Sequence, residues 1–148
     1  MKIEYIENYI DFKNDCKVIN KNWRQFKKDG HLVIHYSDGT KETYYHKKGF
    51  LFDHASVPGI PFFRRWRFST DLNEASYIHD ILFIHRIGTV ETSADIMNYV
   101  MEYCGVRSVK RWLIYKAVLS PFAYRIWNKN NERDFLNKFF CGVIKNDE

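Results

Sequence analysis

The stretch HLVIHYSDGTKETYYH, residues 31–46, predicts an antiparallel β-hairpin. Its first six residues are β-branched, aromatic or apolar, a composition that favours strands. Asp38-Gly39 is a strong hairpin signal, because tight turns between antiparallel strands need residues that tolerate a positive φ angle. The last six residues alternate well enough to form the return strand. Gly49 permits a further turn into a third strand, FLFD, so we expect a small antiparallel sheet.

The segment before this hairpin, residues 1–28, is polar and rich in Asn and Lys, with an aromatic residue every few positions. We predict an N-terminal arm, as a short helix or an extended segment near Tyr5 to Phe12. An irregular segment should follow around Trp23 and Phe26. Residues 29–70 then form the β-rich part. It ends in a long ordered loop, because Pro58 and Pro61 exclude a helix across residues 55–69.

The rest of the chain, residues 71–148, has helical periodicity. Asp71 or Asn73 can cap the first helix, in which Ala75, Ile78, His79 and Leu82 share one stripe. The predicted helices run from about 71 to 87, from 92 or 93 to 104, from 107 to 127 with a break at Pro121, and from 131 to 144. The fold class is therefore α+β, a small sheet packed on a bundle of about four helices in one domain, residues 1–148.

The composition excludes several classes of protein. A hydrophobic fraction of 45% and an aromatic fraction of 18% exclude a disordered chain. No apolar run is long enough to span a membrane, and the N-terminus lacks the pattern of a cleaved signal, so we expect a cytoplasmic or virion-associated protein. Cys16, Cys104 and Cys141 share no metal-ligand spacing and are predicted to be reduced thiols. The net charge of +5 is moderate and does not by itself identify a partner.

His79 and Asp80 interrupt the apolar run ASYIHDILF, residues 75–83. If the first two helices pack as an antiparallel hairpin, Asp95 of the second helix can meet His79 across the interface. A carboxylate that orients an imidazole creates a general base. Asp80 lies about 100° further around the helix, where a carboxylate suits Ca²⁺ or Mg²⁺. The alternative is that His79 is an ordinary core histidine and that both aspartates are solvated or capping residues.

Three motifs, taken together, resemble a family of phage and prophage proteins that is catalogued only as a domain of unknown function. They are GFLFDHASVP at 49–58, ASYIHDILF at 75–83, and SAD at 93–95 with GV at 105–106. The resemblance covers roughly residues 30–127. Phe52 and Phe83 replace the Thr and Tyr that are usual in the family. The resemblance implies that Asp53, His79, Asp80 and Asp95 are the polar positions of the site, flanked by His54, Ser56, Phe83 and Arg86 as substrate contacts.

The helix pair also resembles, more distantly, the A2-class phospholipases, particularly the capsid-borne parvoviral kind. That resemblance implies an ester hydrolase in which His79 activates water and Asp95 orients the imidazole of His79. It also implies that Asp80, together with Asp53, binds Ca²⁺ or another divalent cation. The Gly-rich calcium loop of those enzymes is not evident here. The His-Asp metal-dependent phosphohydrolases fit less well, because the upstream histidines His31, His35 and His46 lie in predicted strands.

Two other functions remain open. The first is a non-catalytic phage protein that binds a host protein and uses the His-Asp cluster only to brace the loop against the helices. The second is nucleic-acid binding through the Arg64 to Arg67 cluster, which rests on charge alone, so nucleic acid is not expected as the partner. Lys110 and Arg111, beside Trp112, are predicted to form a solvated helix face.

Overall fold

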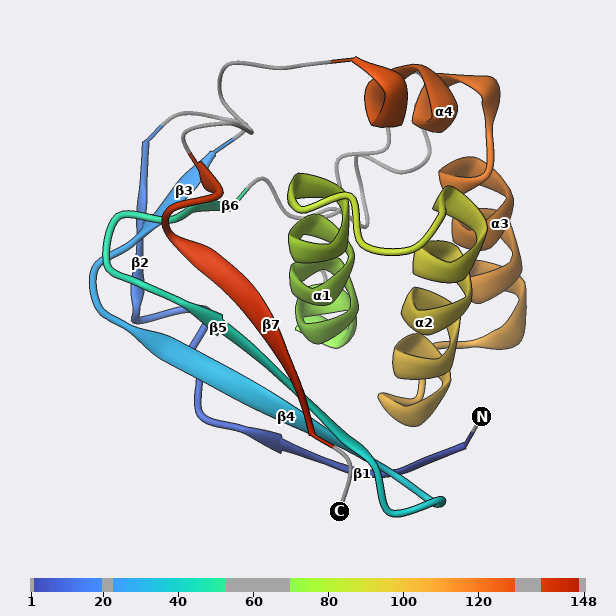
Figure 1. Ribbon diagram of the computed structural model, residues 1–148, viewed down its shortest axis with the longest axis horizontal. Helices are drawn as coiled ribbons and strands as arrows, with labels where there is room; N and C mark the ends of the chain where they lie inside the picture. The colour runs from blue at the N-terminus through green and yellow to red at the C-terminus, as the bar shows by residue number, and fades with distance from the viewer. Residues whose placement is uncertain (1, 20–22, 53–69, 130–136, 147–148) are drawn as a thin grey trace.

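The computed structural model describes residues 2–19, 23–52, 70–129 and 137–146. Two antiparallel sheets lie on one side of the molecule and the four α-helices on the other (Figure 1). This arrangement confirms the α+β class. None of the helices in these ranges is both long and apolar enough to cross a membrane.

The larger sheet contains the predicted hairpin. Its strands are β1 (Ile3–Asn8), β4 (Gly30–Tyr36), β5 (Lys41–His46) and β7 (Cys141–Asn146), in the order β1-β4-β5-β7. β4 and β5 pair antiparallel, and Gly39 in the turn between them has a φ angle of 90°. Alternate side chains on the two strands are buried, as period-two patterning requires. The hairpin prediction is confirmed.

The smaller sheet consists of β2 (Cys16–Val18), β3 (Arg24–Phe26) and β6 (Leu51–Phe52), in the order β2-β3-β6. β6 confirms the predicted third strand over Leu51–Phe52, although it pairs with β3 rather than with the hairpin. The N-terminal arm was predicted as either a short helix or an extended segment, and the structure confirms the extended one at residues 3–8. These residues form β1, which pairs with β4. The irregular segment predicted around Phe26 is wrong there, because Phe26 belongs to β3 and is buried.

The predicted terminal helix, residues 131–144, is wrong over residues 141–144, which belong to β7 and pair with β5, and its first part, residues 131–136, lies outside the described residues. The sequence there, CGVIKN, is a short apolar run that fits either structure by periodicity. The free edge of β5 offers a complete row of backbone hydrogen bonds, and Val143 and Ile144 are β-branched residues that suit a strand. A partner distant in the sequence therefore determined the structure of this segment.

Four α-helices follow the sheets, close to the predicted positions. They are α1 (Asn73–Ile84), preceded by the 3₁₀ turn Thr70–Leu72, α2 (Val90–Tyr103), α3 (Ser108–Val118) and α4 (Pro121–Asn128). Pro121 occupies the first turn of α4, so the predicted break is confirmed. The predicted cap of α1 is wrong, because no side chain caps it and Asp71 instead accepts a hydrogen bond from Lys110 Nζ at 3.1 Å. Thr89 and Thr92 cap α2 reciprocally.

α1 lies between the sheets and α2 (Figure 1). Ala75, Ile78 and Leu82 of the predicted stripe are buried. Tyr77 is fully buried, and its ring lies against an aromatic cluster drawn from the sheets and the segments beside them, namely Phe12, Phe26, His46, Phe50 and Phe52. The three cysteines are free thiols, as predicted.

Candidate functional site

His79 lies near the middle of α1, with its ring centroid 4.5 Å from that of Phe83. The side chain keeps partial exposure, but Nε2 is closed to solvent and, in the described part of the chain, has no hydrogen-bond partner. Burial lowers the pKa of His79 to about 4, so the imidazole is neutral at pH 7. A neutral imidazole can accept a proton, and an unsatisfied ring nitrogen in a folded protein calls for a functional or structural explanation.

Asp95 lies on the side of α2 that faces α3. Tyr115 of α3 donates its hydroxyl hydrogen bond to Asp95 Oδ1 at 2.7 Å. Ser93 and Met97, two residues to either side, are buried. Two residues turn an α-helix by about 200°, so Asp95 points away from the face that carries them. The predicted pairing of His79 with Asp95 is accordingly not among the hydrogen bonds of the described residues.

Asp80 is half-buried on α1, next to His79 in sequence. The other expected positions of the loop, Asp53, His54 and Ser56, lie outside the described residues. Within the ranges that the structure describes, no group of three or more His, Cys, Asp or Glu side chains could hold a metal ion. The described residues alone therefore do not make a calcium site.

Phe83 is buried on α1, with its ring between that of His79 and that of Trp127 on α4. Its ring lies 5.0 Å from that of Trp127, at an interplanar angle of 83°. Val90 and Ala123 belong to the same small cluster of buried side chains. The side chain of Phe83 thus connects the candidate site to α4 through apolar contacts.

Arg86 joins the end of α1 to the end of α4. Its guanidinium donates to the carbonyl oxygens of Trp127 at 2.8 Å and of Ile126 and Lys129 at 3.1 Å each, and also to that of Phe83. Its φ angle of +51° is unusual for a residue with a side chain. The sequence predicted a substrate contact here, whereas the structure shows Arg86 bound to backbone carbonyls at a helix C-terminus.

His46 was not singled out among the candidate residues, although its place in the alternating pattern of β5 puts it on the buried face. Its Nε2 lies 3.0 Å from the carbonyl oxygen of Lys28, and its Nδ1 lies 2.8 Å from the hydroxyl of Tyr77. Because a carbonyl only accepts, Nε2 carries the proton and Nδ1 accepts from Tyr77. Burial lowers the pKa of His46 to about 4. Both ring nitrogens of His46 have partners, so this histidine is a structural group, whereas Nε2 of His79 has no hydrogen-bond partner in the described part of the chain.

Because His46 and His79 both have a lowered pKa, we predict that the free energy of unfolding decreases in acid. Their pKa is about 4 in the folded protein against an ordinary value of 6.5. Between these values the unfolded chain binds the protons, so stability falls as pH falls, by at most about 1.4 kcal/mol per pH unit for each histidine. Urea unfolding from pH 7 to 4.5 should show this slope. His79→Leu should reduce it, and an unchanged slope in that variant would contradict the prediction.

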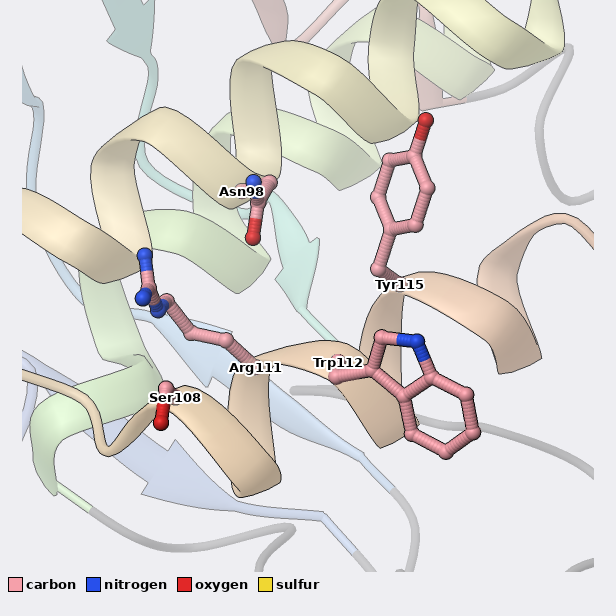
Figure 2. A pocket seen from close by; sticks show the side chains of 5 residues that line it. All are labelled: Asn98, Ser108, Arg111, Trp112 and Tyr115. Carbon is pink, nitrogen blue, oxygen red and sulfur yellow. The ribbon is translucent and has the colours of Figure 1, made fainter.

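A hollow of about 240 Å³ lies between α2 and α3, apart from His79. Its lining residues are Asn98, Ser108, Arg111, Trp112 and Tyr115. Figure 2 shows Arg111 and Tyr115 extending from α3 toward α2, with Trp112 beside them. Arg111 Nη1 lies 3.5 Å from Glu102 Oε2. The sequence predicted only a solvated face here, because the hollow depends on how α2 and α3 pack.

Comparison with known proteins gives one match. Residues 32–118 match the family model described as "Protein of unknown function (DUF1353)". This range covers all three sequence motifs in full. No curated protein and no solved structure matches the chain.

Proposed function

Because the chain belongs to the DUF1353 family of proteins of unknown function, we propose an activity from its own residues. The protein is an ester hydrolase, with phospholipids as the favoured substrates and His79 as the general base. The observation that carries the proposal is the buried Nε2 of His79, which has no hydrogen-bond partner in the described part of the chain. Phage origin, and a place in the host cytoplasm or the virion, belong to the same proposal.

The chemistry requires a neutral base. Burial keeps His79 unprotonated at pH 7. Because Nε2 is closed to solvent in the described structure, the attacking water has to enter the site with the substrate before the ring nitrogen that carries the lone pair can take its proton. The oxygen of that water forms a bond to the ester carbonyl carbon. The bond to the alcohol oxygen then breaks, and the alcohol leaves with the proton that His79 had accepted. Asp95 has no step here, because its carboxylate accepts the hydroxyl hydrogen bond of Tyr115.

Asp80 is proposed as a second polar group at the site, next to His79. One half-buried carboxylate is not a calcium site by itself, and Asp53 would have to complete it. For this reason the test compares buffer containing calcium with buffer containing a chelator. Dependence on calcium would support the two aspartates as ligands.

A second candidate function has its own supporting observation. Two of the predicted site residues connect helices. Arg86 binds the end of α4, and Asp95 of α2 accepts a hydrogen bond from Tyr115 of α3. A site whose polar groups are used in this way suits a non-catalytic phage protein that binds a host protein. The two functions differ in what replacing His79 would do.

The test is hydrolysis of a panel of phosphatidylcholine, phosphatidylglycerol and a soluble p-nitrophenyl ester by the full chain. Removal of a general base is expected to lower kcat/KM by about 100-fold or more in His79→Gln. His31→Gln, at an exposed histidine of β4, is the matched control and should retain wild-type activity. Failure of the wild-type protein to hydrolyse any substrate, with or without calcium, would overturn the hydrolase.

His79→Leu separates the two functions through stability. Because Nε2 makes no hydrogen bond in the described structure, leucine should leave the free energy of unfolding unchanged or raise it by about 1 kcal/mol. Urea denaturation measures this change. A loss of stability would show that His79 forms a bond that braces the fold, and would favour the non-catalytic protein.

A further inference from the structure

α3 carries large apolar side chains on its solvent side. Val109, Trp112 and Leu113 are 69%, 58% and 36% exposed. They are spaced by three and four residues, so they share one face of the helix. α3 lies at the edge of the molecule, with α2 between it and α1 (Figure 1). A contiguous exposed apolar face of this kind marks an interaction surface.

The same segment carries the positive charge of the chain. Residues 107–129 contain no Asp or Glu but six basic residues, which are Arg107, Lys110, Arg111, Lys116, Arg125 and Lys129. This segment therefore accounts for the entire excess of the chain's 23 basic residues over its 18 acidic residues. Such a concentration favours an anionic partner.

Among the described residues, three acidic groups from neighbouring elements have a partner on α3, and Glu91, which also acts on Tyr115, is hydrogen-bonded by Tyr124 of α4. Asp71 lies 3.1 Å from Lys110 Nζ and Glu102 lies 3.5 Å from Arg111, whereas Asp95 accepts from Tyr115. Arg107 and Lys116 are exposed, and Lys116 Nζ lies 6.0 Å from the centre of the Trp112 ring. Lys116 follows Trp112 by four residues and Leu113 by three, so this exposed cation lies on the apolar face itself.

We propose that this face of α3 docks onto a bilayer of anionic phospholipids. Val109, Trp112 and Leu113 enter the interface, where an indole is favoured, and Lys116 contacts lipid phosphates. The hollow beside Trp112, lined also by Ser108 and Arg111, lies next to this face and supplies hydrogen-bond donors for a headgroup.

A bilayer fits these observations better than other partners do. Nucleic acid would use the cations and could stack on Trp112, but it offers nothing for the aliphatic side chains of Val109 and Leu113. A second copy of this chain would bring the same basic face against itself, which like charges oppose. An anionic bilayer satisfies both the apolar and the basic groups.

Docking is independent of catalysis, although it would also bring a phospholipid hydrolase to its substrate. The test therefore uses ether-linked lipids, which have no ester bond to cleave. Full-length protein is sedimented with vesicles of phosphatidylcholine alone, or of phosphatidylcholine and phosphatidylglycerol in equal parts. We expect binding to the anionic vesicles to be about tenfold tighter or more, and to weaken as salt is added.

Two variants test the two halves of the surface. A triple variant, Val109→Ser, Trp112→Ser and Leu113→Ser, and a charge-reversal variant, Lys116→Glu, should each bind anionic vesicles about tenfold more weakly. Ile144→Ser, at a half-exposed position on β7, is the control and should bind like the wild type. Circular dichroism of each variant confirms that it is folded.

Three results would overturn the proposal. They are equal binding to both kinds of vesicle, no binding to either, and wild-type binding by the triple variant. Duplex DNA that binds more tightly than the anionic vesicles, and equally well to the triple variant, would assign the surface to nucleic acid instead. His79→Gln should bind vesicles like the wild type, so a protein that docks but hydrolyses nothing would keep this proposal and overturn only the hydrolase.

Discussion

Tyr77→Ala is expected to lower the free energy of unfolding by about 4 kcal/mol, in the range seen when a buried aromatic residue is truncated. Tyr77 is fully buried, and Phe12, Phe26 and Phe52 lie within 6.1 Å of it, centroid to centroid. The truncation would leave a cavity between α1 and the sheets that these rings cannot fill without moving. Urea denaturation, analysed at constant m-value, measures the loss.

Two variants control for this result. Tyr77→Phe keeps the ring and removes only the hydroxyl that donates to His46, so it should cost about 1–2 kcal/mol. Tyr103→Ala, at a tyrosine that is 45% exposed, should cost less than Tyr77→Phe. If Tyr77→Ala proved as mild as Tyr103→Ala, the aromatic cluster would not be the centre of the core.

Arg86→Ala is expected to cost about 3 kcal/mol, the second largest effect. The substitution removes hydrogen bonds from a charged group to four carbonyl oxygens, three of them in the last turn of α4 and the residue after it. Those carbonyls lose a cation at a helix C-terminus, where positive charge is favourable. Thermal and urea unfolding measure the total loss, and hydrogen exchange of the α4 amides should show that helix opening first.

The backbone of Arg86 provides an internal control. At a φ angle of +51°, alanine is strained by about 1 kcal/mol, whereas glycine is not. Arg86→Gly should therefore be about 1 kcal/mol less destabilising than Arg86→Ala. If glycine were the worse of the two, the left-handed conformation would not contribute. If both were neutral, Arg86 would not hold α4 and would be available to bind a substrate.

These predictions bear on the candidate site, because α1 and α4 enclose Phe83 beside His79. A variant that loosens α4 without touching His79 would change the surroundings of the imidazole. Activity measurements on Arg86 variants should accordingly be read together with their stability. His79→Gln, for which stability should be preserved, is the cleaner test of catalysis.

The helices that carry His79, Asp80 and Asp95 could be predicted from the sequence, but the contacts of these residues could not. Spacing placed His79 and Asp80 on α1 and Asp95 on α2. It did not give the rotation of α2, which is set by the burial of Ser93 and Met97 and which directs Asp95 to Tyr115. A rotation of about 100° per residue means that a small change in packing selects a different partner.

By itself the sequence determined the elements whose signals are local. Asp38-Gly39 and the alternation around it specified the β4–β5 hairpin, and Pro121 specified the break between α3 and α4. Tertiary structure decided the rest. Residues 141–146 became a strand because the edge of β5 offered backbone partners about 100 residues away. The exposed face of α3 and the partner of Asp95 likewise depend on how helices pack against one another, which no short stretch of sequence encodes.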